Sequence, residues 1–304
     1  MSDAIAAMAL GSARGRAWRR FRRHPLAIAG AAVLALLTLA ALCAPLVEAG
    51  LGIDANQVNL LARFAPPSAE AWLGRDELGR DVFVRLLYGG QVSLLVGVVT
   101  ALVAASIGTC IGLFAGFRGG IADAILMRFT DSIIALPLLP LLIVLAALDL
   151  IKLGVPDAIA QSEQISLYRI VIIVALAGWT TSARLVRGAA LTLRERDFVA
   201  AGRAQGASSA RIMFVHILPN LMSPIVVATT LSAGKIILME SVLSFLGLGI
   251  QPPTSSWGNM LTNAQQMIQS NPELALYPGA LIFLTVIAFN FIGDGLQDAL
   301  DPKA

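Results

Sequence analysis

The uncharged stretch LAIAGAAVLALLTLAALCAPLV, residues 26–47, decides the class of fold. The stretch is 22 residues long, whereas the apolar region of a cleavable signal peptide has about 7–15 residues. Its length suits a bilayer-spanning helix, which needs about 20 residues. The stretch is therefore predicted to span a membrane. The whole chain agrees, because 13% of its 304 residues are charged, against about 25% in soluble domains.

Five further apolar stretches are predicted to span the membrane, at residues 86–117, 129–148, 170–183, 221–246 and 274–293. The stretch 129–148 contains Pro137 and Pro140, which predict a kinked helix that faces the bundle. The stretch 170–183 is short, so the sequence does not fix the ends of that helix. The expected fold is an all-α integral membrane protein with six transmembrane helices.

The distribution of charge predicts the orientation of these helices. Six arginines precede the first span and six surround the loop between the fourth and fifth spans, whereas residues 48–85 hold four arginines and six acids. Loops rich in arginine and lysine stay in the cytoplasm. We therefore expect both termini and the loop 190–220 to be cytoplasmic. Because each basic cluster adjoins an apolar span, contact with membrane lipid is expected and nucleic acid is not.

The loop DFVAAGRAQGASSARIMFVHILPN, residues 197–220, interrupts the apolar pattern. Its first part, 197–205, predicts a short helix with an almost bare surface, which Gly206 ends with a turn. Residues 212–218 predict a second short helix with one apolar side, and Pro219 stops it or starts the next span. A helix with small side chains lets the backbone of another protein approach closely, so the loop is interpreted as a docking surface for a partner protein. The alternative interpretation is a connecting loop without a partner.

The same loop resembles the signature of permease subunits in binding-protein-dependent ABC importers. That signature reads Glu-Ala-Ala, three residues, Gly, nine residues, then Ile-x-Leu-Pro. Here Ala200 replaces the glutamate, and Asp197 lies one turn earlier on the same face. The signature positions are Ala200, Ala201, Gly202, Gly206, His216, Leu218 and Pro219.

Three other stretches narrow the resemblance to the dipeptide/oligopeptide branch of that family. Residues 73–97 resemble the segment before its second span, with Gln91 where arginine is common. Residues 244–261 and 289–302 are similar to the C-type permease subunit of this branch. The resemblance covers the chain from about residue 15 to its end.

The resemblance implies a type I ABC importer transmembrane fold. Residues 1–90 would hold the cytoplasmic arm, the first helix and an extracytoplasmic segment. Residues 91–297 would form the transmembrane domain with its ATPase-coupling loop at 190–220, and 298–304 the cytoplasmic tail. The implied partners are a homologous B-type permease subunit, two ATP-binding subunits and an extracytoplasmic substrate-binding protein. The implied substrates are peptides, with nickel or glutathione as alternatives.

The chain itself is expected to be a permease subunit and not an enzyme. It contains no G-x-x-x-x-G-K-[ST] sequence, so ATP and Mg would be held by the partner subunits. No cofactor or metal site is expected, because the two histidines are isolated. An intramembrane hydrolase is disfavoured because His24 and His216 fall outside the spans.

Several other residues are candidates for functional sites, and the sequence allows a structural and a functional role for each. Arg80 and Asp81 would either fix a loop through a local salt bridge or help to receive substrate. The segment Gln251-Pro252-Pro253 would be a rigid extended connector, and Trp257 an anchor at the outer interface, or both would contact substrate. Asp294 and Asp298 share a helix face and would solvate the inner end of the last span or brace a cytoplasmic gate.

Two charges fall inside the fifth predicted span. Lys235 and Glu240 are functional candidates because ionisable residues at membrane depth are costly. They are five residues apart and do not share a helix face, which speaks against one joint site. Each of them would contact substrate or serve a subunit interface. A secondary transporter or channel is the remaining alternative, and it would work without ATPases.

Overall fold

The fold is given by a computed structural model that describes residues 15, 18–152, 154–160, 162, 164–262 and 267–300. No β-strand occurs in these ranges, which confirms the all-α class. Short 3-10 turns occur at Leu60–Ala62 and Asn259–Leu261. The helices are α2 (Pro25–Leu42), α3 (Ala44–Leu51), α4 (Val82–Arg118), α5 (Gly120–Ala135), α6 (Leu138–Ala146), α7 (Asp157–Ala160), α8 (Ile165–Leu193), α9 (Asp197–Ala204), α10 (Ser209–Arg211), α11 (Leu218–Phe245) and α13 (Glu273–Leu300).

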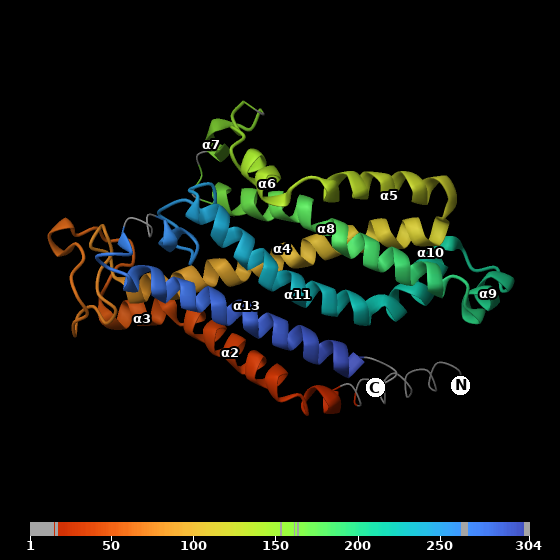
Figure 1. Cartoon of the computed structure of the whole chain (residues 1–304), viewed down its shortest axis with the longest axis horizontal. Helices are drawn as coiled ribbons and strands as arrows, with labels where there is room; N and C mark the ends of the chain where they lie inside the picture. Colours follow the sequence, from red (N-terminus) through yellow and green to blue (C-terminus); the bar gives the residue numbers. More distant parts are fainter. Residues whose placement is uncertain are drawn as a thin grey trace.

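Five helical stretches in the described ranges are long and apolar enough to cross a membrane. They are Pro25–Leu42, Val82–Arg118, Ile165–Arg194, Ser209–Phe245 and Glu273–Leu300. The pair α5 and α6 makes a sixth when it counts as one broken span. Figure 1 shows these helices side by side in an elongated bundle. The predicted boundary at residue 90 lies within α4, and α13 runs three residues into the predicted tail.

The third predicted span is broken and not merely kinked. The axes of α5 and α6 differ by 87°. Because a proline forces the preceding residue out of the helical region, Leu136 is extended and α5 stops before Pro137. Pro140 falls in the first turn of α6, where no helical hydrogen bond is lost. α5 faces the bundle along one side only: Phe129 stacks on Trp179 of α8, while Thr130 is the one fully buried residue of this helix.

The fourth span, α8, has 29 residues and extends well beyond the 14 uncharged ones. Its arginines are accommodated because acids on α5 lie opposite them. Arg184 Nη2 lies 2.5 Å from Asp131 Oδ1, and Arg187 donates two hydrogen bonds of 2.5 and 2.6 Å to Asp123. These ion pairs join α8 to α5 and explain how a helix with internal charges forms a span.

α4 and α8 touch along glycines at every fourth position. A Cβ atom at Gly108, Gly112 or Gly116 would lie 2.4, 2.3 or 2.8 Å from a backbone carbonyl oxygen of α8. Atoms cannot approach so closely, so only glycine permits this contact. Small residues at this spacing are typical of close helix pairs in membranes. The spacing of glycines 108, 112 and 116 in the sequence is the pattern from which the close contact of α4 and α8 could have been predicted.

Two further helices, α2 and α13, lie side by side and complete one flank of the bundle (Figure 1). A Cβ atom at Gly30 would lie 2.7 Å from the Ala288 oxygen, so this contact is also close. His24 caps α2, since its Nδ1 accepts a hydrogen bond of 3.2 Å from the Ala27 N–H. The start of α2 and the end of α13 lie at the end of the bundle that carries α9.

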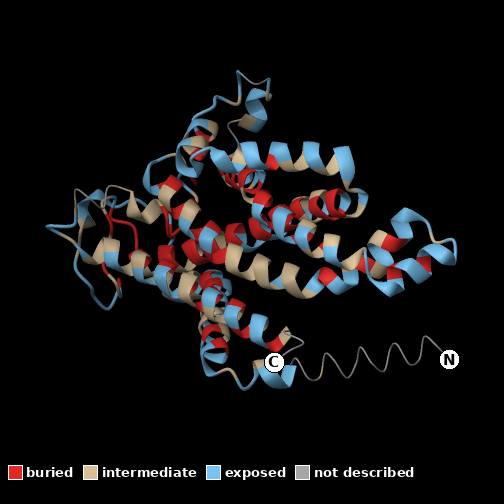
Figure 2. Ribbon diagram, turned by 45° about the vertical axis from the view of Figure 1, so that its right-hand side comes forward, coloured by how far each residue is buried: buried red, intermediate tan, exposed pale blue. Residues whose placement is uncertain are grey.

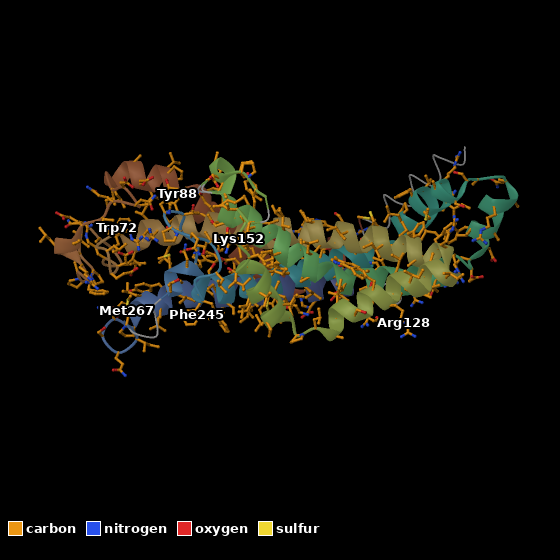
Figure 3. The ribbon with its side chains drawn as sticks, turned by 90° about the horizontal axis from the view of Figure 1, so that it is seen from above. Trp72, Tyr88, Arg128, Lys152, Phe245 and Met267 are labelled. Atoms are coloured by element: carbon orange, nitrogen blue, oxygen red, sulfur yellow. The ribbon has the colours of Figure 1, made fainter. Side chains whose placement is uncertain are left out.

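We call the end with α9 the loop end and the opposite end, with residues 52–81 and 246–262, the distal end. Residues 301–304 and nearly all of the arm before Trp18 lie outside the described residues. Buried apolar side chains form a large cluster among α4, α8, α11 and α13, and a smaller one at the loop end. Figure 2 shows that buried residues follow the helix contacts, while the outer faces are exposed. Figure 3 places Tyr88 and Met267 toward the distal end and Arg128 on the outward side of α5.

Candidate functional site

One face of α9 is packed against the bundle. Val199 is fully buried in the smaller cluster with Leu113, Ile212 and Ile217. Gly202 is also buried, and a Cβ atom there would lie 3.8 Å from the His216 ring. This inward face fixes α9 to the ends of α4, α8 and α11.

The opposite face of α9 is exposed and nearly bare. Asp197, Ala200, Ala201 and Ala204 are all exposed and follow the spacing of one helix face. The predicted short helix with a bare surface is therefore confirmed. The signature residues divide, with Ala200 and Ala201 facing outward and Gly202 facing the bundle.

Gly206 ends α9 as expected. Its φ is +78°, a region that residues with a Cβ rarely adopt. Its N–H donates to the Arg203 oxygen at 3.0 Å, and the Ala207 N–H donates to the Gly202 oxygen at 3.0 Å. Nothing lies within 4 Å of a Cβ placed on Gly206. Glycine is thus required here by the backbone angle and not by space.

The second short helix is not separate from the fifth span. α10 continues through a π-helical segment (Ile212–Ile217) into α11, and the helix is continuous from Ser209 to Phe245. Of the two predicted roles of Pro219, stopping the short helix or starting the next span, the structure has the second, because Pro219 occupies the first turn of α11. A proline lacks an N–H and its ring crowds the carbonyl four residues earlier, so a wider turn fits here. In the same turn, Asn220 Nδ2 donates to the His216 oxygen at 2.7 Å.

The distal end contains a buried polar group that we call the distal node, formed by Ser93, Glu240, Ser244, Ser256 and Trp257. Glu240 is fully buried. Its carboxylate accepts hydrogen bonds from Ser244 at 2.7 Å, Ser256 at 3.0 Å and Ser93 at 3.4 Å. The node therefore ties the segment after α11 to both α11 and α4.

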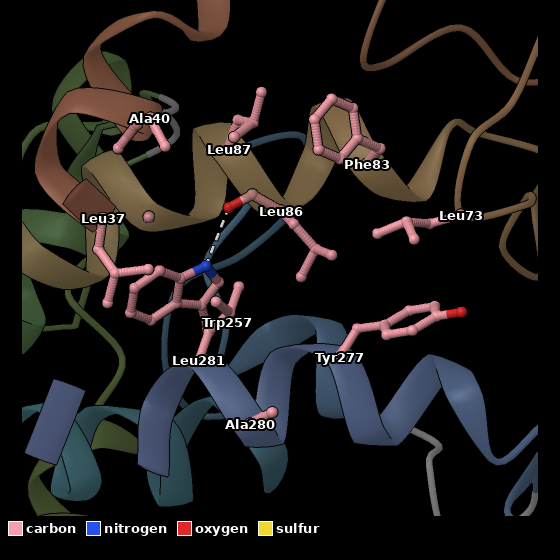
Figure 4. Close-up of a pocket in the computed structure, with 12 residues that line it drawn as sticks. Leu37, Ala40, Leu73, Phe83, Leu86, Leu87, Trp257, Tyr277, Ala280 and Leu281 are labelled. Atoms are coloured by element: carbon pink, nitrogen blue, oxygen red, sulfur yellow. Dashed lines mark hydrogen bonds between the residues drawn. The ribbon is translucent and has the colours of Figure 1, made fainter. Parts of the chain in front are cut away.

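Trp257 is buried, so the expectation of an exposed interfacial anchor is wrong. Its side chain is 2% exposed, and the indole N–H donates to the Leu86 oxygen at 2.9 Å (Figure 4). A Cβ atom at Gly89 or Gly90 would lie 3.1 or 3.0 Å from the indole ring, so this glycine pair makes room for it. The ring borders an apolar cavity of about 300 Å³ between α2, α4 and α13, with Tyr277 on its other side.

Arg80 and Asp81 take part in local contacts but not with each other. Arg80 Nε lies 2.7 Å from Asp76 Oδ2, and Arg80 Nη2 lies 3.3 Å from Glu77 Oε1. Asp81 caps α4, since its Oδ1 accepts from the Val84 N–H at 2.9 Å. The predicted local ion pair exists for Arg80, but its partners are one turn earlier in the chain.

The segment Gln251-Pro252-Pro253 makes a turn on the exposed surface of the distal end. The Pro252–Pro253 peptide bond is cis, and Gln251 Nε2 donates to the Gly247 oxygen at 2.9 Å. The expectation of an extended connector is wrong, because both prolines lie in this turn.

Asp294 and Asp298 lie in the last turns of α13 at the loop end, and both are exposed. Asp298 Oδ2 lies 3.5 Å from His24 Nε2, which links the start of α2 to the end of α13. Their position at the end of the last span matches the sequence analysis, and a gating role stays a prediction.

The two charges in α11 lie in different surroundings. Glu240 belongs to the distal node, whereas the Lys235 side chain is exposed and lines a cavity of about 320 Å³ with residues of α5, α6 and α8. Among the described residues, no group of three or more His, Cys, Asp or Glu side chains could hold a metal ion. The sequence analysis marked both residues but could not separate their environments.

A bundle of helices long and apolar enough to cross a membrane, with a helical loop held at one end, defines a multi-pass membrane protein. Residues 108–304 match the family described as binding-protein-dependent transport system inner membrane component. Residues 12–67 match the N-terminal TM domain of oligopeptide transport permease C. The chain belongs to this family of ABC transporter permeases and is a multi-pass protein of the inner membrane.

The chain is similar along most of its length to several curated permeases. It is 41% identical over 287 residues to the dipeptide transport system permease protein of Alkalihalophilus pseudofirmus, covering 94% of this chain and 89% of the relative. It is 38% identical over 284 residues to the oligopeptide transport system permease protein of Bacillus subtilis, covering 93% and 88%. It is 40% identical over 289 residues to the glutathione transport system permease protein of Pectobacterium atrosepticum, covering 94% and 90%.

Proposed function

We propose that this chain is the C-type permease subunit of an ATP-driven peptide importer. It pairs with a homologous B-type permease subunit, receives peptide from an extracytoplasmic binding protein and is driven by two ATPase subunits that hold ATP and Mg. The names of the dipeptide and oligopeptide relatives support a peptide substrate. Glutathione, itself a small peptide derivative, is the alternative that the third relative supports, and nickel remains the other.

The observation that carries the coupling role is the two-sided packing of α9. Its exposed face bears the small side chains of Ala200, Ala201 and Ala204, so a partner backbone can approach closely. Its buried face is fixed to the bundle through Val199 and Gly202. A helix that is free on one side and fixed on the other can pass a partner's movement to the spans.

The charge pattern supports a cytoplasmic position for this surface. Both ends of the described chain lie at the loop end with α9, and the arginine-rich segments are at that same end (Figure 1). The ATPase subunits then meet the loop end, and the binding protein meets the distal end. ATP binding moves α9, and the spans change from inward-open to outward-open.

The test uses the complete transporter in liposomes. Ala201→Trp places a large side chain on the exposed face of α9, while Ala201→Ser keeps the residue small and serves as the control. We expect both variants to insert normally, but only Ala201→Trp to lose ATPase association, stimulated ATP hydrolysis and peptide uptake.

Two results would contradict the proposal. If Ala201→Trp couples as well as the wild type, the loop is only a connector. If liposomes that contain this chain alone take up peptide, the protein works without ATPases, and the secondary transporter alternative holds.

A further inference from the structure

Lys235 lies near the middle of the predicted span 221–246. It precedes the end of α11, Phe245, by ten residues, which corresponds to about 15 Å along the helix. The hydrocarbon core of a bilayer is about 30 Å thick. A lysine at this depth faces hydrocarbon only at a high cost, so its exposed side chain indicates a water-filled space or a charged partner.

No carboxylate of the surrounding helices is available to Lys235. The helices that form the cavity are α5, α6, α8 and α11, and they carry three acids in all. Asp123 and Asp131 pair with arginines of α8, and Glu240 is enclosed by the serines of the distal node. Within the described ranges, Lys235 forms no ion pair.

The cavity beside Lys235 has the size and lining of a site for a small peptide. Its volume is about 320 Å³, within the range of about 300–1,000 Å³ typical of small-molecule sites. The side chains that line the cavity are mostly aliphatic. Thr180 and Thr181 of α8 and Ser232 of α11 add hydroxyl groups to the lining. No acidic residue lines it.

The break between α5 and α6 gives an independent indication of water at this place. Leu136 and Leu138, on the two sides of the break, line the same cavity. Helix ends leave backbone N–H and C=O groups without helical partners, and such groups occur at membrane depth only inside protein or beside a water-filled cavity. The cavity is therefore a place where a hydrated solute can stay during transport.

We propose that Lys235 binds the C-terminal carboxylate of a peptide in transit, an inference that rests on the proposed peptide import. Every peptide has this carboxylate, whatever its side chains are. A single ammonium group among aliphatic walls would hold this common feature and tolerate different side chains. The N-terminal ammonium of the peptide is repelled by Lys235 and points away from it.

Charge-changing variants of the complete transporter test this role. Lys235→Gln removes the charge, Lys235→Arg keeps it, and Lys152→Gln removes an exposed lysine in the loop before α7 as the matched control. We expect Lys235→Gln to reduce the turnover of peptide uptake about tenfold, the effect of losing one charged hydrogen bond. Subunit assembly and ATP hydrolysis stimulated by the binding protein should stay unchanged, and Lys235→Arg should retain most uptake.

The chemistry is tested with a tetrapeptide and its C-terminal amide, both loaded to saturation on the binding protein. The wild type should transport the acid faster than the amide, and Lys235→Gln should transport both at the same low rate. Equal loss for acid and amide in Lys235→Gln would overturn the carboxylate contact. Loss of subunit assembly in Lys235→Gln would also overturn it, because Lys235 would then pair with the second permease subunit.

A separate measurement examines whether water reaches this position. With Cys43 and Cys110 replaced by alanine, Lys235→Cys should react with a water-soluble thiol reagent, and peptide should slow the reaction. A cysteine that does not react would overturn the proposal. Failure of the proposed function looks different, since the wild-type complex itself would then show no ATP-dependent peptide uptake.

Discussion

At the distal end the Glu240 carboxylate is fully buried and bonded to three serines, whereas at the loop end the Asp197 carboxylate and the alanines of α9 are exposed. The distal node satisfies the Glu240 carboxylate with hydrogen bonds from within the chain. The loop end leaves a bare surface that another protein can cover. The difference indicates that substitutions at the distal end act on the stability of this chain, and substitutions at the loop end act on its association with partners.

The largest expected effect on the free energy of unfolding comes from a substitution in the distal node. Trp257→Ala removes a buried ring and its hydrogen bond to Leu86, and should reduce the free energy of unfolding by about 3–5 kcal/mol. Trp72→Ala is the control, because Trp72 is 54% exposed and its ring lies tilted against that of Phe83, with the ring centroids 5.1 Å apart. It should cost about 0.5–1.5 kcal/mol. Unfolding in mixed micelles gives both values, and equal values would show that the burial of Trp257 in the distal node adds no stability.

A smaller effect is expected where α9 ends. Gly206→Ala places a Cβ on a residue with positive φ and should destabilise the loop by about 1 kcal/mol. Gly188→Ala, in the exposed interior of α8, is the matched control, because a Cβ has open space at both positions. It should stabilise the chain by about 0.5–1 kcal/mol. If both variants change stability in the same direction, the backbone angle of Gly206 is not what requires glycine.

The smallest effect on the chain is expected at the signature position that lacks its glutamate. Ala200 is exposed, so Ala200→Glu should change the free energy of unfolding by no more than about 0.5 kcal/mol. Association with the ATPase subunits should be as strong as in the wild type or stronger. The measurement is the amount of ATPase retained on the purified permease at increasing salt. Weaker retention would mean that the partner surface near Ala200 is not complementary to a carboxylate.

Several parts of the fold could be predicted from the sequence because they depend on one residue type in one place. Uncharged stretches of 20 residues or more identified three of the long spans, α2, α4 and α13, and Gly206 marked a turn that requires positive φ. The length of α8 could not be predicted, since Arg184 and Arg187 are compatible with a span only when their acid partners on α5 are known.

The position of Trp257 shows the same limit for the candidate site. Tryptophan is common at membrane interfaces, and that preference favoured an exposed anchor. The indole is instead buried because the adjacent glycines Gly89 and Gly90, far away in the sequence, leave space on α4. The charge of Lys235 and its place within a predicted span can be read from the sequence, but only the three-dimensional structure shows which acids around it are already paired.

The continuous helix from Ser209 to Phe245 has a mechanical consequence. Its 37 residues extend about 55 Å, and the distal node holds it at Glu240 while α9 contacts its other end. Along the helix, Lys235 is five residues from Glu240 and Ser209 is 31 residues away, so a rotation about Glu240 moves Lys235 about one-sixth as far as Ser209, less what the bends at Pro224 and at the π-helical segment absorb. In such a lever the displacement near the pivot is smaller and the force is correspondingly larger. A movement of one helical turn at the loop end, about 5.4 Å, becomes a displacement of about 1 Å beside the cavity, delivered with about six times the force.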